Sequence, residues 1–192
     1  MRTIVGLAAA LVSAVGAVAQ PIVEGLISSP VRVVIYEDLQ CSDCARFRAM
    51  LDEKLLPRYG AKVAFQHRDF PLAKHAWARK AAVAARYFQQ VKPELGIDYR
   101  REVMAHIAEI TAAGFEGHLA KFAASRGVDA PSAIAALHDA KLAALVEKDY
   151  QDGVARGVAK TPTVFVDGNP FIETFTVEEI SAGIDRALAA AK

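Results

Sequence analysis

The chain has 192 residues, with 23 Lys or Arg, 22 Asp or Glu, and a net charge of +1. This near balance, without a run of basic residues, argues against binding to nucleic acid or to an anionic membrane surface. The length is sufficient for one domain with a hydrophobic core, or for one domain with an insertion.

Residues 1–19 have the pattern of a signal peptide. Arg2 forms a short basic region, residues 4–18 are apolar, and Ala17-Val18-Ala19 matches an A-x-A cleavage site. A membrane-spanning helix needs roughly 20 apolar residues, so we favour export and cleavage before Gln20 over a membrane anchor. The mature protein is therefore expected to be periplasmic or secreted, in an oxidising compartment.

The next segments predict a strand, a helix and a second strand. Residues 20–30 are interpreted as a lead-in, and 31–36 have the apolar, β-branched character of a buried parallel strand. Apolar residues at three- and four-residue spacing predict a helix over 45–56, which Pro57 is expected to end. A second strand is predicted at 63–67, which completes a right-handed βαβ unit.

The only two cysteines, Cys41 and Cys44, stand between the first predicted strand and its helix. Three residues apart on a first helical turn, their sulfurs face the same side at a separation that suits a disulfide. The unpaired amides and positive dipole end of a helix N-terminus favour a thiolate. The pattern therefore predicts a redox-active pair.

Two other interpretations of the pair remain open. In the first, the two cysteines are half of a zinc site, although no second C-x-x-C or H-x3–5-H pair supplies the remaining ligands. In the second, they form an inert structural disulfide, although a disulfide that closes so short a loop gives the smallest stabilisation by chain entropy. The histidines are scattered along the sequence: His67, His75, His106, His118 and His138.

The region from 72 to 156 is almost entirely helical in pattern, and we interpret it as a module inserted into a small α/β domain. The expected helices cover 75–90, 99–112, 115–125 and 131–156, the last with a break near Asp139.

The C-terminal part predicts a β-β-α arrangement. Residues 163–167 form a strand, Gly168-Asn169 a turn, and 170–172 a short edge strand that begins with a proline. Thr176 and Glu179 match a capping box at the start of the last helix. The predicted order is β-α-β, helical insert, β-β-α, in the α/β class.

Three stretches together resemble one known family. They are Cys41-Ser42-Asp43-Cys44 after a strand, Arg68-Asp69-Phe70-Pro71-Leu72 followed by His75, and residues 157–168 with Thr161-Pro162. With the helical insert they cover nearly all of 31–192. The sequence resembles the thioredoxin superfamily, and more closely its exported DsbA-type thiol–disulfide oxidoreductases, including the DsbG-like and BdbD-like members.

The resemblance implies a thioredoxin-like fold at 20–192, built from 31–71 and 157–192, with the helical module at 72–156 between the second strand and the cis-proline strand. It also implies roles for four residues. Cys41 is the exposed nucleophile, Cys44 the resolving thiol, Pro162 the cis-proline beside the disulfide, and Thr161 the residue whose backbone meets an extended substrate chain. No organic cofactor is needed, because the Cys41–Cys44 disulfide is the redox group.

The sequence departs from its relatives near the cysteines. Many thioredoxin-like proteins carry a buried acid six residues before the first cysteine, where this chain has Ile35. Asp38 matches an acid of DsbG-like and BdbD-like sequences. We favour a solvated strand end for Glu37 and Asp38, with tuning of the cysteines by Asp38 as the alternative.

The residues between and near the cysteines complete the expected site. Ser42 and Asp43 replace the Pro-His of strong oxidants, and the carboxylate of Asp43 is expected to disfavour a thiolate on Cys41 and to make the protein a weaker oxidant. We favour a packed, structural role for His75 over an acid–base role. No dimerisation domain precedes the fold, which favours a monomer.

The predicted function is disulfide exchange with exported, cysteine-containing proteins through Cys41 and Cys44. A membrane partner would complete the cycle, either a quinone reductase that accepts electrons or a thiol relay that donates them. The alternative is a binding protein: a thioredoxin-like chaperone, or a metallochaperone whose cysteines hold copper(I).

Overall fold

A mixed β-sheet organises the molecule in the computed structural model, which describes residues 21–191. The predicted signal peptide and its cleavage site lie outside the described residues. The strands pair in the order β1-β3-β2-β4-β5; only β2 and β3 run parallel, and the other neighbours are antiparallel. The strands are β1 (Ile22–Gly25), β2 (Arg32–Glu37), β3 (Ala64–Asp69), β4 (Thr163–Val166) and β5 (Asn169–Ile172).

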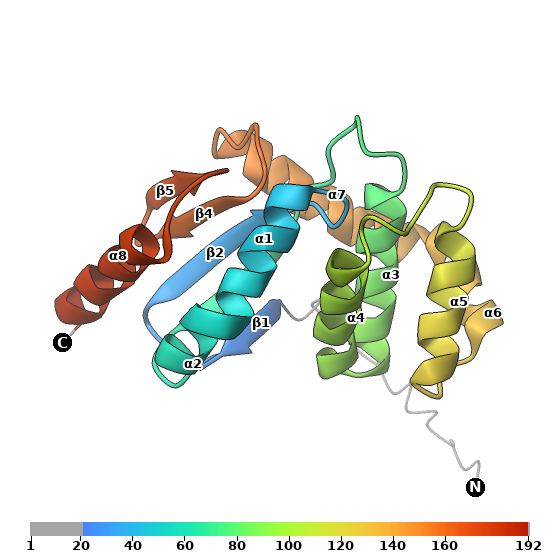
Figure 1. Ribbon diagram of the computed structural model, residues 1–192, viewed down its shortest axis with the longest axis horizontal. Helices are drawn as coiled ribbons and strands as arrows, with labels where there is room; N and C mark the ends of the chain where they lie inside the picture. Colours follow the sequence, from blue (N-terminus) through green and yellow to red (C-terminus); the bar gives the residue numbers. More distant parts are fainter. Residues whose placement is uncertain (1–20, 192) are drawn as a thin grey trace, which may run out of the picture.

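Helices cover the sheet and extend away from it (Figure 1). Beside the sheet lie α1 (Ser42–Met50), a π-helical turn (Leu51–Leu55), α2 (Leu56–Tyr59) and α8 (Val177–Ala190). The inserted module consists of α3 (Ala78–Val91), α4 (Pro93–Ala105), α5 (Phe115–Ser125), α6 (Ala130–Ala135), a 3-10 turn (Ala136–His138) and α7 (Ala140–Ala155). The α/β class and the insertion between β3 and β4 are therefore confirmed.

Two main apolar cores hold the molecule together. In the first, Val33 and Ile35 of β2 pack with Phe47 of α1 and Ile184 of α8. The second belongs to the helical module and contains large side chains of α3, α4 and α5, such as Phe88, Tyr99 and Phe122. Both cysteines are part of this second core, so the redox pair lies where the sheet domain meets the module.

Three of the predicted elements are wrong in detail. The lead-in at 20–30 contains β1, which pairs antiparallel with β3. Pro57 does not end its helix: the π-helical turn at Leu51–Leu55 runs directly into α2, and the chain stays helical through the proline. The helix expected at 99–112 covers Pro93–Ala105 instead, since Pro93 is well suited to a helix start. The break near Asp139 is confirmed, and Asp139 caps α7.

Candidate redox site

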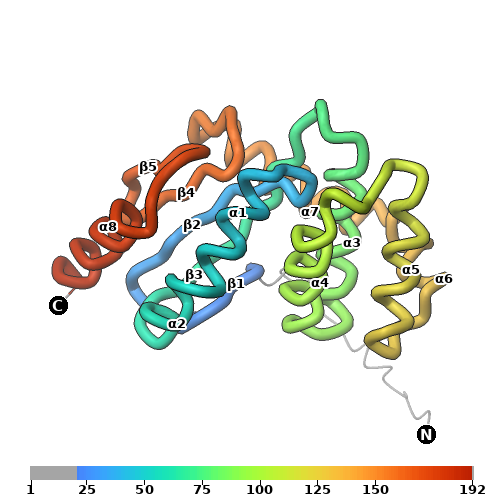
Figure 2. The backbone as a smooth tube through the Cα atoms, in the orientation of Figure 1, coloured from blue at the N-terminus to red at the C-terminus, as the bar shows by residue number. Residues whose placement is uncertain are grey.

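The start of α1 places both cysteines at one end of the sheet. Cys41 is the N-cap residue of the helix and Cys44 lies in its first turn. Cys44 is fully buried, whereas Cys41 is 8% exposed. Figure 2 shows the start of α1, the segment after β3 and the turn before β4 at the same end of the molecule. The Cys41 sulfur is therefore the one that a reaction partner reaches first.

Residues far along the chain complete the site. The Cys41 thiol donates to the main-chain oxygen of Thr161 at 3.3 Å, across 120 residues. The Thr161–Pro162 peptide bond is cis. Thr161 is 2% exposed, and its side-chain hydroxyl has no hydrogen-bond partner among the described residues. The two segments singled out in the sequence are thus in contact.

The two thiols have opposite acidities. A hydrogen bond from the Cys44 thiol, with smaller contributions from the nearby Thr161 side chain and the Cys44 backbone N–H, lowers the pKa of Cys41 to about 6 against the opposing effect of burial. Burial, followed by the neighbouring Cys41, raises the pKa of Cys44 well above its usual range. At neutral pH Cys41 is a thiolate and Cys44 keeps its proton. A thiolate is the nucleophile in disulfide exchange.

Asp38 is a buried residue of the site, so its interpretation as a solvated strand end is wrong. The residue is 1% exposed, and its carboxylate accepts hydrogen bonds from the backbone N–H groups of Gln40 and Leu72, each at 2.7 Å. Its own N–H lies 3.4 Å from the Cys44 sulfur. The turn after β2 folds this carboxylate inward beneath the cysteines, and its charge raises the pKa of Cys41.

His75 also belongs to the surroundings of the pair. Its Nδ1 lies 2.8 Å from the Asp38 carboxylate, and its side chain is 19% exposed. It precedes α3 by three residues and does not start that helix. The packed role of His75 is thus a hydrogen-bonded contact with Asp38, whose N–H in turn contacts the Cys44 sulfur.

Glu37 is equally far from the solvated state expected for it. It is 3% exposed, and its carboxylate lies 2.9 Å from His67 Nδ1 and accepts from Arg100 at 2.8 Å. Burial alone would raise its pKa, but the charges of His67 and Arg100 outweigh that effect and lower it. The charge on Glu37 helps to raise the pKa of Cys44.

Asp43 and Ser42 point outward. The Asp43 carboxylate pairs with Arg46 one turn further along α1, and Ser42 is exposed. The carboxylate with a resolved effect on the pKa of Cys41 is that of Asp38. The sequence predicts that the charge of Asp43 influences the pKa of Cys41. In the structure it is the buried Asp38, before the cysteines, whose charge does so.

A hollow of about 370 Å³ opens beside Cys41. Its lining includes Asp43, Leu72, Lys74, Lys160, Thr161 and Glu173. Lys160 is held by Glu173 at 2.7 Å. An extended chain entering this hollow would meet Thr161 and the Cys41 sulfur together.

The chain belongs to the thioredoxin family, since the family model described as Thioredoxin matches residues 18–186. Within that superfamily its fold is of the DsbA and BdbD type. BdbD from Bacillus subtilis aligns with a TM-score of 0.79 and 22% identity, over 88% of this chain and 93% of that one. Alpha-DsbA1 from Wolbachia pipientis aligns with a TM-score of 0.76 and 20% identity, over 89% and 92%. A thioredoxin-like oxidoreductase from Silicibacter pomeroyi gives 0.71 and 21%, over 87% and 91%.

Curated relatives of similar sequence are longer proteins. Na(+)/H(+) antiporter NhaA 3 of Salinispora tropica is 27% identical over 173 residues, which are 88% of this chain and 25% of the antiporter. NhaA of Herminiimonas arsenicoxydans is 28% identical over 154 residues, 80% of this chain and 23% of that protein. The chain thus spans about a quarter of these relatives. Within residues 21–191, no helix combines the length and apolar character needed to cross a bilayer.

Proposed function

We propose that the protein exchanges disulfides with exported, cysteine-containing proteins. The observation that carries the proposal is the opposite acidity of two adjacent thiols: Cys41 ionised at neutral pH, Cys44 buried and protonated. A thiolate attacks a substrate disulfide, and a second thiol is needed to release the mixed disulfide that results. Cys41 and Cys44 supply these two groups.

The surroundings support a protein substrate. The hollow beside Cys41 leads to Thr161, which precedes β4. An extended segment of a client can align there with its sulfur near Cys41, held by main-chain contacts in the manner of an added strand. Pro162 and Thr161 are the proposed substrate-binding residues. Asp38 is the residue proposed to set the redox poise.

The rest of the cycle is part of the same proposal. The protein works as a monomer in the periplasm or outside the cell, and the Cys41–Cys44 disulfide takes the place of an organic cofactor. A membrane partner restores its redox state, either a quinone reductase or a thiol relay. The fold that this chain shares with BdbD and alpha-DsbA1 supports this role.

The experiment is a trap. Cys44→Ala should leave Cys41 covalently joined to client proteins in non-reducing gels, because no thiol remains to resolve the mixed disulfide. Cys41→Ser should form no adducts, and the double variant is the matched control. Adducts that form through Cys44 when Cys41 is absent would reverse the assigned roles. A pair that takes up copper(I) but has no reversible two-electron transition in glutathione buffers would favour the metallochaperone.

A further inference from the structure

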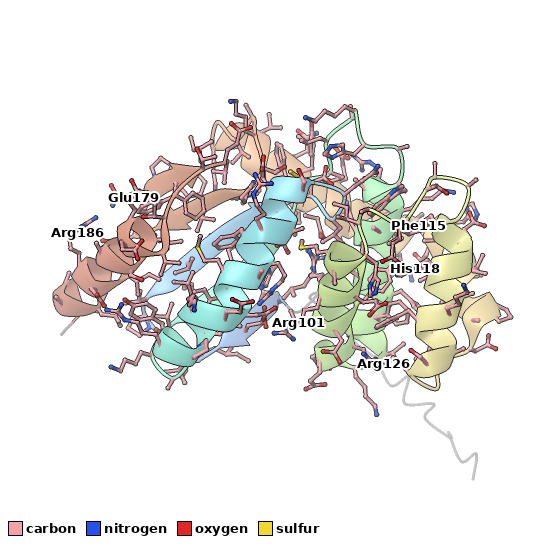
Figure 3. All side chains as sticks on the ribbon, in the orientation of Figure 1. Arg101, Phe115, His118, Arg126, Glu179 and Arg186 are labelled. Atoms are coloured by element: carbon pink, nitrogen blue, oxygen red, sulfur yellow. The ribbon has the colours of Figure 1, made fainter. Side chains whose placement is uncertain are left out.

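Three metal-ligating side chains converge between α4 and α5, at a distance along the chain from the redox pair. Glu102 lies in the last turn of α4, His106 is the C-cap residue of that helix, and His118 lies in the first turn of α5. Figure 3 labels His118 on the side of α5 that faces α4. The sequence alone shows these histidines as scattered; the loop between the two helices brings them together.

The separations are close to those of a coordination site. His106 Nδ1 lies 3.2 Å from a Glu102 side-chain oxygen, and His118 Nε2 lies 3.7 Å from the same atom. One ligating atom from each of the three residues lies within 4.8 Å of the other two. Ligands at about 2.0–2.1 Å from a tetrahedral ion are roughly 3.3 Å apart. Small rotations of partly exposed side chains are enough to reach that geometry.

His118 has an unmet requirement that an ion would satisfy. Its Nε2 is buried and has no hydrogen-bond partner among the described residues, although it faces the Glu102 carboxylate. A buried nitrogen without a partner costs stability, and coordination removes that cost.

His106 directs one ring nitrogen at Glu102. Its Nδ1 lies 2.9 Å from the main-chain oxygen of Glu102, one turn earlier in α4, as well as near the carboxylate. An ion bound through Nδ1 would replace the hydrogen bond to the main-chain oxygen. Glu102 and His106, four residues apart, share one face of the helix.

We propose that Glu102, His106 and His118 form a binding site for a divalent transition-metal ion of the zinc class. Two imidazoles and one carboxylate suit borderline ions such as Zn²⁺. Water completes the coordination because all three side chains are partly exposed. The bound ion ties the end of α4 to the start of α5 and is separate from the chemistry of Cys41 and Cys44.

The test uses the full chain in its oxidised form, because free thiolates would themselves bind zinc. Zn²⁺ titrated calorimetrically should bind at one equivalent and raise the melting temperature. His118→Ala and His106→Ala should each weaken binding by at least about tenfold. Glu102→Gln, which keeps the shape of the side chain, should also weaken it.

His138→Ala is the matched control, because His138 is an exposed histidine of the same module outside the site. It should bind Zn²⁺ like the unaltered protein. Circular dichroism establishes that each variant is folded, and Glu102→Gln decides the matter if a histidine variant is not. Absence of binding by the oxidised protein, unchanged binding after His118→Ala, or an equal loss in His138→Ala would each overturn the proposal.

Discussion

Two thiols three residues apart differ in acidity because their neighbours differ. Cys41 has hydrogen bonds that favour its anion, whereas Cys44 lies in an apolar core near the charge of Glu37. Asp38 acts on both: its N–H contacts the Cys44 sulfur, and its charge opposes ionisation of Cys41. A residue that the chain hides from solvent therefore reduces the difference between the two pKa values.

Replacement of Asp38 by Asn should lower the pKa of Cys41 by up to about one unit, since a negative charge beneath the sulfur is removed. The disulfide then becomes more oxidising by roughly 30 mV per unit. The measurement is the pH dependence of Cys41 alkylation, with a glutathione equilibrium beside it. Asp43→Asn is the control and should change little, because Asp43 pairs with Arg46 on the outer surface. A larger shift in the control would restore Asp43 as the tuning residue.

Sequence patterns could locate the cysteines but not the state of the acids beside them. The C-x-x-C spacing at a strand-to-helix junction is local, so its geometry follows from a few residues. Glu37 and Asp38 looked solvated because charged residues at a strand end usually are. Their partners Arg100 and His75 lie 63 and 37 residues away. No local pattern contains such pairings.

Among the elements, α7 shows how closely the module packs on the sheet. Gly153 of α7 lies against the rings of Phe70 and Tyr36, and a Cβ atom there would stand 2.7 Å from Phe70. In contrast, a Cβ atom at Gly117 of α5 would meet nothing within 4 Å. The two glycines are both helical but differ completely in surroundings.

Gly153→Ala should destabilise the protein by about 1–3 kcal/mol, because the added methyl group forces ring and helix apart. Gly117→Ala should be neutral or stabilising by about 0.5–1 kcal/mol, since alanine is the better helix former. Urea unfolding of both variants measures the difference. Equal changes in unfolding free energy would mean that α7 can shift to accommodate the methyl group, and that Gly153 is not closely packed against Phe70 and Tyr36.

Element prediction succeeded where periodicity is strong and failed where pairing is distant. The helices α3 and α5 follow clear apolar spacing. The strand β1 has only four residues, and its pairing with β3 joins positions such as Ile22 and His67, 45 residues apart. Pro57 predicts a helix end that the structure does not have, and the π-helical turn before it has no recognisable sequence signature.

At the scale of the whole molecule, buried charges join the inserted module to the sheet. Arg100 of α4 is fully buried and pairs with Glu37 of β2 and Asp69 of β3. Arg86 of α3 pairs with Asp69 and with Asp149 of α7. One member of this network, Glu37, is near enough to the redox pair for its charge to raise the pKa of Cys44. These contacts hold sheet and module in one arrangement, because a displaced helix would leave a charge without its partner.

Arg100→Met should cost about 3–5 kcal/mol of unfolding free energy, since it leaves two buried carboxylates short of a partner. Arg79→Met is the control: its pair with Glu147 is exposed, and an exposed pair contributes roughly 0–1 kcal/mol. Chemical denaturation compares the two variants. A cost for Arg100→Met no larger than that of the control would show that the network does not join the two parts.

The redox state should also change the pH dependence of stability. Ionised Cys41 stabilises the reduced fold, because its pKa falls from 9.0 to about 6 on folding. This contribution is fully present above the unfolded value and is lost as pH falls through about 6. Cys44, with its raised pKa, keeps its proton between pH 5 and pH 8 in both states. The oxidised protein has neither thiol, whereas its carboxylates are the same as those of the reduced protein and cancel in the comparison.

The difference in unfolding free energy between reduced and oxidised protein should therefore shift against the reduced form between pH 8 and pH 5, with a slope of at most about 1.4 kcal/mol per pH unit. Paired urea titrations at both pH values measure it. Cys41→Ser is the control: it forms no disulfide and has no Cys41 thiol to ionise, so its stability should follow the pH dependence of the oxidised protein. A pH-independent difference would mean that Cys41 is not ionised in the folded protein.

The 120 residues between Cys41 and Thr161 have a consequence for a chain that is made from its N-terminus. The Cys41 thiol leaves the ribosome long before Thr161, whose side chain is one of the groups that lower its pKa. During that interval Cys41 lacks one of the contacts that lower its pKa and is a less reactive thiol. The full reactivity of Cys41 is thus reached only when about five sixths of the chain has been made, so a half-made molecule is poorly equipped to attack its neighbours.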